Sequence, residues 1–238
     1  MPLGNLATFK RTESKVKRIT ITSHKEDIFL IERLIDVYID GFRLVDSVPI
    51  IDRSQLDHAW ILLTARSFNS MRCAYELIKL GYYSQAVTLA RSVYEDWLIC
   101  QDCQTSRDTL DAVLSGKGKL RQNDLRYSAM AKRISKRFHD DIWKPNYGVQ
   151  SEFAHAHAHS LNLLLDSETN MVRFGSHYDQ KGLIFACQNL IMLAIIMTEF
   201  LQKVLGSDGN SWEKEALPII REAHEWLEST GSGVVNQT

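Results

Sequence analysis

Arg91 and Glu95 are a pair of residues whose types and spacing indicate chemistry. They stand four positions apart in the segment 84–103, where apolar residues recur at helical spacing, so a helix would bring them within reach of each other. Two interpretations are open. On a solvated face the pair would contribute only a few tenths of a kcal/mol. If a second helix covers the pair, Arg91 and Glu95 form a fixed, desolvated site that binds an anion or transfers a proton.

The candidate second helix, 148–165, carries an unusual density of histidine. His155 and His159 are four residues apart, with Glu152 one turn before them, which is a spacing that metal ligands on a helix use. A di-iron bundle would need a second Glu-x-x-His, and a zinc enzyme of this kind would need the order His-Glu-x-x-His. The sequence contains neither. We therefore expect no metal and no cofactor.

The same helix predicts the rest of a polar site. Ser151, Glu152, His155 and His159 share one of its faces. We expect His155 to join Arg91 and Glu95 as the reacting residues, while Ser151, Glu152 and His159 contact the ligand.

Cations dominate the segment 117–137, which has eight Lys and Arg residues against one acidic residue, Asp124. Such a run is either a solvated helix face or a surface that neutralises phosphates. Under the second interpretation, the contacts to RNA or DNA come from one group of cations: Lys132, Arg133, Lys136 and Arg137.

Helices must position all of these residues. The apolar periodicity and the caps predict helices from Ser23 to about residue 47 and over 54–80, 84–103, 107–114, 123–142, 148–165, 181–205 and 212–229. The link Gly81–Ser84 is short, with Gly81 ending one helix and Ser84 capping the next, so those two helices form an antiparallel hairpin. The polar loop 166–180 has room for a short β-hairpin around 172–174. We predict an all-α, multi-helix bundle with a central antiparallel helix hairpin.

The predicted organisation is a basic, flexible segment over 1–22, one helical domain over 23–230, and a frayed tail over 231–238. A net charge of −1 in 238 residues gives no overall bias towards nucleic acid or membrane. The N-terminus lacks a signal-peptide core, which favours the cytoplasm, and Gln188 and Asn189 interrupt the apolar run 183–198, which favours a buried helix over a membrane span. The four cysteines are expected to stay reduced. The oligomeric state is open, with a homodimer as one option.

Three motifs carry a family resemblance: Leu80-Gly81-Tyr82-Tyr83, Leu89-Ala90-Arg91-Ser92-x-x-Glu95 and Tyr147-x-x-x-Ser151-x-x-x-His155. With them, the stretch 54–162 resembles a family of uncharacterised bacterial helical proteins known by a domain-of-unknown-function label. That family is distantly similar to the HEPN helical domains, which include nucleotide-binding modules and metal-independent ribonucleases with an Arg-x(4–6)-His motif. This spacing occurs here at Arg53/His58 and Arg133/His139.

Two functions remain open. One is a binding or accessory module of a mobile-element or defence system, with an Arg/Glu/His pocket for an anionic group and a basic surface for nucleic acid. The alternative is a HEPN-like, metal-independent ribonuclease. In that enzyme His155 would act as general acid or base and Arg91 would stabilise a phosphorane-like transition state.

Overall fold

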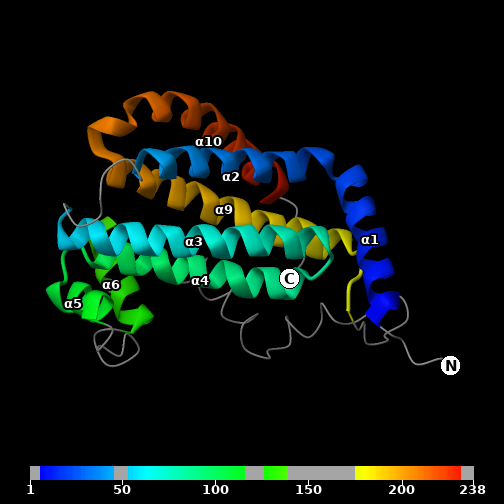
Figure 1. Cartoon of the computed structure of the whole chain (residues 1–238), viewed down its shortest axis with the longest axis horizontal. Coiled ribbons are helices and arrows are strands. Elements are labelled where there is room, and N and C mark those ends of the chain that lie inside the picture. The colour runs from blue at the N-terminus through cyan, green and yellow to red at the C-terminus, as the bar shows by residue number, and fades with distance from the viewer. Residues whose placement is uncertain (1–5, 46–52, 116–125, 139–174, 232–238) are drawn as a thin grey trace.

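The computed structural model describes residues 6–45, 53–115, 126–138 and 175–231. Across these residues the chain forms eight α-helices and one 3₁₀ turn, Gly206–Gly209, and no strand (Figure 1). The predicted all-α bundle is therefore confirmed. The expected helix over 148–165 and the expected hairpin around 172–174 lie outside the described residues.

The N-terminal segment differs from the expectation. Residues predicted to be flexible form α1, Leu6–Ser23, and Ser23 is its last residue rather than the cap of the next helix, α2, Lys25–Val45. Tertiary contacts hold α1 in place, because Val16 and Thr20 are buried and the Tyr82 hydroxyl donates to Glu13 Oε1 at 2.8 Å. A mostly polar helix depends on such packing more than on its own sequence pattern.

The hairpin consists of α3, Gln55–Lys79, and α4, Tyr83–Asp102. At its turn, Gly81 adopts φ +80°, the Gly81 N–H donates to the Ile78 carbonyl at 3.1 Å, and the Tyr82 N–H donates to the Leu77 carbonyl at 2.9 Å. These two bonds make a Schellman motif, which satisfies the last carbonyls of α3. Ser84 lies inside the first turn of α4 and is not its N-cap, which is Tyr82.

Side-chain contacts along the hairpin show that the two helices run antiparallel. Hydrogen bonds join Trp60 to Cys100, Arg66 to Asp96 and Ser70 to Ser92. Residue numbers therefore increase along α3 while those of their partners decrease along α4. Two short helices, α5, Arg107–Ser115, and α6, Tyr127–Phe138, lie at the end of the hairpin farthest from α1 (Figure 1). The described part of α6 covers the middle of the helix expected over 123–142.

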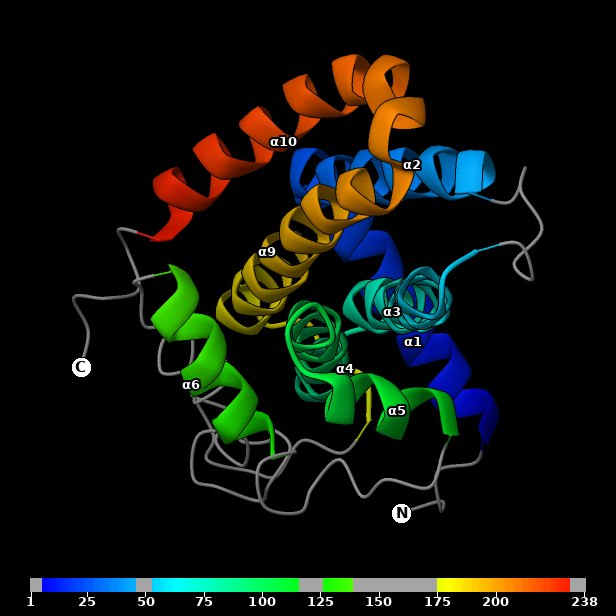
Figure 2. The ribbon, with the colours of Figure 1, turned by 90° about the vertical axis from the view of Figure 1, so that its left-hand side faces the viewer.

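The central helix is α9, Gln180–Leu205, which has α2 and α10, Asn210–Gly231, on one side and the hairpin on the other (Figure 2). By length and composition alone, α9 could cross a membrane. However, 61% of its most apolar stretch of 18 residues is buried inside the bundle. Gly41 lets α2 approach α9 and α10 closely, since a Cβ there would lie 2.8 Å from the side chains of Leu201 and Trp212.

Candidate functional site

Arg91 and Glu95 form the expected i,i+4 ion pair on α4. The Arg91 Nε donates to Glu95 Oε1 at 3.0 Å, and the two side chains are only 15% and 11% exposed. The interpretation as a pair on a fully solvated face is therefore wrong. A covered pair is screened less by solvent than a surface pair, so its geometry is held more firmly.

A second ion pair, which the sequence analysis missed, lies beside the first. The Asp96 carboxylate is fully buried between α3 and α4 and accepts from Arg66 Nε at 3.0 Å and from Ser67 Oγ at 3.0 Å. Burial raises the pKa of Asp96, and the hydrogen bonds from Arg66 and Ser67 oppose this shift. One feature of the sequence points to Asp96: it falls three residues after Val93 and four before Cys100, on the apolar stripe of α4.

The predicted partners of Arg91 on the helix 148–165 lie outside the described residues: Ser151, Glu152, His155 and His159. Their place beside Arg91 and Glu95 stays a prediction. Among the described residues, no group of three or more His, Cys, Asp or Glu side chains is placed to hold a metal ion.

Asp102, at the C-terminal end of α4, joins three helices. Its carboxylate is fully buried and accepts from Arg133 Nε at 2.8 Å, from Arg133 Nη2 at 2.5 Å and from the Thr109 hydroxyl at 2.6 Å. The Arg133 side chain, from α6, remains 37% exposed. Bidentate pairing of this kind fixes the orientation of the guanidinium. Arg133, predicted as a nucleic-acid contact, therefore has a structural role as well.

The other three predicted nucleic-acid contacts occupy two faces of α6. Lys132 and Lys136 are exposed, whereas Arg137 is half-buried and donates to Gln101 Oε1 at 2.8 Å and to the Gln101 carbonyl at 3.2 Å. Beside them is an open groove of about 360 Å³, lined by Thr105, Arg133, Ile134, Lys136 and Arg137. The Arg137 guanidinium also lies 4.7 Å from the centre of the exposed Phe138 ring. The structure thus gathers three of the four predicted cations at one groove.

The structure describes only some residues of the two Arg-x(4–6)-His motifs. The Arg53 Nη2 donates to the Val45 carbonyl at 2.7 Å, and Arg133 pairs with Asp102. His139 lies outside the described residues. Both arginines therefore have bonds within the fold.

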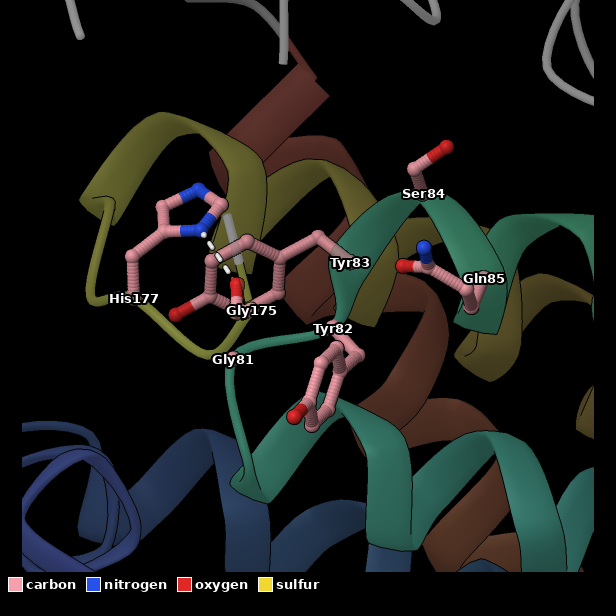
Figure 3. Close-up of a pocket in the computed structure, with 7 residues that line it drawn as sticks. All are labelled: Gly81, Tyr82, Tyr83, Ser84, Gln85, Gly175 and His177. Atoms are coloured by element: carbon pink, nitrogen blue, oxygen red, sulfur yellow. Dashed lines mark hydrogen bonds between the residues drawn. The ribbon is translucent and has the colours of Figure 1, made fainter. Parts of the chain in front are cut away.

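A small cavity lies at the α3–α4 turn, where the motif Leu80-Gly81-Tyr82-Tyr83 occurs (Figure 3). The Tyr83 and His177 rings meet edge to face with centroids 5.8 Å apart, and burial raises the pKa of Tyr83 to about 12. A Cβ on Gly81 would lie 2.1 Å from the His177 carbonyl oxygen, so this position requires glycine. The cavity holds about 50 Å³, which suits a water molecule rather than a ligand. This motif therefore has a packing explanation.

The three buried cysteines are unreactive thiols. Burial raises the pKa of Cys100 and Cys187, and it raises the pKa of Cys103 to about 12, so these thiols stay protonated near neutral pH. All four cysteines are free, and Cys73 alone is exposed.

Comparisons of the chain with known protein families, with curated proteins and with solved structures found no match. The resemblance to a helical bacterial family and to HEPN domains therefore stays a prediction.

Proposed function

We propose that this protein is a binding or accessory module, of a mobile-element or defence system, that binds the phosphates of nucleic acid at the groove beside α6. The observation that carries the proposal is the groove lined by Arg133, Lys136 and Arg137. Phosphate groups prefer such clusters of cations, and guanidiniums bind them through two hydrogen bonds at once.

Two of the three cations are already oriented by the fold. Asp102 fixes Arg133, and Gln101 fixes Arg137, so less side-chain entropy is lost when a ligand binds. The charge balance also supports an anionic ligand. Lys132, Arg133, Lys136 and Arg137 carry four positive charges against the single negative charge of Asp102, which leaves a local charge of +3.

The polar pocket is the second part of the proposal. Arg91, oriented by its ion pair with Glu95, would hold an anionic group of the ligand together with His155. The low exposure of the Arg91–Glu95 pair supports this role, because a covered guanidinium attracts an anion more strongly than a solvated one does.

Binding to a short single-stranded RNA, followed by fluorescence anisotropy, tests the groove. The variant Lys132→Gln/Lys136→Gln leaves both fixed arginines in place, and Lys203→Gln/Lys214→Gln removes the same charge from exposed sites on α9 and α10. Each phosphate contact contributes about 0.7 to the salt slope for single strands. Because Lys136 lines the groove and Lys132 lies outside its lining, the first variant should lower the slope by at least about 0.7. The control should bind like the wild type. Equal binding by both variants would show that the groove is not used.

The same RNA distinguishes the alternative function. After incubation in EDTA, intact RNA supports a binding module. Cleavage that disappears in both Arg91→Ala and His155→Ala would instead identify a metal-independent ribonuclease.

A further inference from the structure

We propose that one face of α1 is a second nucleic-acid surface, which binds the sugar-phosphate backbone of a duplex. The inference rests on the proposed function for its class of ligand, but the surface is separate from the α6 groove. At 100° per residue, one side of the helix carries four cations and no acid. Its members are Ala7, Lys10, Arg11, Ser14, Lys15, Arg18, Ile21 and Thr22.

The bundle turns this cationic face outwards. On the opposite side of α1, Val16 and Thr20 are buried and Glu13 accepts from Tyr82, while Lys17 at its edge lies 3.7 Å from Glu76. The helix is thereby held in one rotation. Lys10, Arg11, Lys15 and Arg18 are all exposed, and with Ser14 they line a shallow groove of about 420 Å³.

The dimensions of this groove suit a phosphate backbone. Lys10 and Arg18 are separated by eight residues, or about 12 Å along the helix axis at 1.5 Å per residue. Phosphates of one strand of a duplex rise about 3.4 Å each along its axis while the strand winds around it, so a face of this length can meet more than one of them. The like-charge pair Arg11 and Lys15, four residues apart on the helix, is mutually repulsive in the free protein. A bound polyanion would relieve this repulsion.

The composition of the face favours a duplex over single strands or a lipid surface. Single strands are held largely by stacking on aromatic side chains, and this face has none. A helix that lies in a membrane surface must bury an apolar face in it, whereas Val16 and Thr20 face the bundle. The exposed Leu6 and Ile21 are about 22 Å apart along the axis, too far to form one apolar strip.

The α1 face acts independently of the α6 groove. The two lie at opposite ends of the hairpin (Figure 1), and α3, with 25 residues, is about 37 Å long. This exceeds the screening length of about 10 Å at moderate salt, so neither surface changes the field at the other appreciably.

Titration of a short DNA duplex between about 50 and 200 mM salt tests the inference. Lys15→Gln/Arg18→Gln removes two exposed cations, so the slope of log affinity against log salt should fall by about 1.8. The control Lys203→Gln/Lys214→Gln should keep the wild-type slope, and an unchanged circular dichroism melt would show that α1 is still folded.

The outcomes separate this inference from the proposed function. If the α1 variant loses duplex affinity while Lys132→Gln/Lys136→Gln binds RNA like the wild type, the α6 groove is rejected and the α1 surface stands. If the α1 variant keeps the wild-type slope, or if the wild type does not bind duplex at low salt, the α1 surface is rejected. Loss of binding to anionic lipid vesicles, with duplex binding unchanged, would also reject it in favour of a membrane contact.

Discussion

The ion pair between Asp102 and Arg133 allows the sharpest test of how this fold is held together. Replacing Arg133 by Ala leaves the fully buried Asp102 carboxylate with the Thr109 hydroxyl but without its cation. Removing one partner of a fully buried pair costs about 3–5 kcal/mol. Because the Arg133 side chain is 37% exposed, water can enter and reduce this cost, and we expect about 2–3 kcal/mol.

Urea unfolding, followed by far-UV circular dichroism at neutral pH, measures this loss. For a chain of this size, about 2–3 kcal/mol corresponds to a fall in Tm of about 5–10 °C. Lys136→Ala, on the same helix but exposed, is the matched control and should stay within about 0.5 kcal/mol of the wild type. The double variant Asp102→Leu/Arg133→Met removes both charges and should recover most of the stability, since it leaves no unpaired buried charge.

An Arg133→Ala variant as stable as Lys136→Ala would contradict a structural role for the Asp102–Arg133 pair. A double variant much less stable than Arg133→Ala would also contradict that role, because the single change would then not owe its cost to an unpaired carboxylate. For the same reason Arg133 is a poor choice for charge reversal in binding experiments. A charge reversal there disturbs the contact of α6 with α4 as well as any contact with phosphate.

Two further predictions concern titration and thiol reactivity. Burial alone would raise the pKa of Glu76, but hydrogen bonds from Arg72 and Lys79 outweigh it and lower the pKa to about 2. A lowered carboxyl pKa stabilises the fold above the unfolded value of 4.5, and this contribution is lost as the pH falls from 4.5 towards 2. Unfolding measured across this range should show a steeper acid loss for the wild type than for Glu76→Gln, by at most about 1 kcal/mol because the group is partly exposed; equal slopes would contradict the assignment. A thiol reagent at mildly alkaline pH should modify Cys73 quickly and the three buried cysteines only after denaturation, and rapid reaction of more than one thiol would show that the core opens readily.

Helices with a strong apolar pattern could be predicted from the residues alone. The apolar periodicity of α2, α3 and α9 placed those helices within a few residues, since each buries a continuous stripe or most of its circumference. Gly81 marked the C-terminal end of α3 because its chemistry is local: a glycine adopts positive φ readily. At the other end the structure adds that the Ser54 Oγ accepts the Asp57 N–H at 3.1 Å. The pairing of Arg91 with Glu95 was predictable, since helix geometry alone sets an i,i+4 contact.

Contacts between residues on different helices could be seen only in the tertiary structure. Composition alone made residues 1–22 look flexible. Contacts of Val16, Thr20 and Glu13 with the bundle hold α1 as a helix with an outward cationic face. Arg133 looked like one cation among several, but the buried Asp102, 31 positions away, fixes it at the junction of three helices. The periodicity of a segment determines which of its own residues share a face. Which distant residue meets that face depends on how the helices pack, and the local sequence does not contain that information.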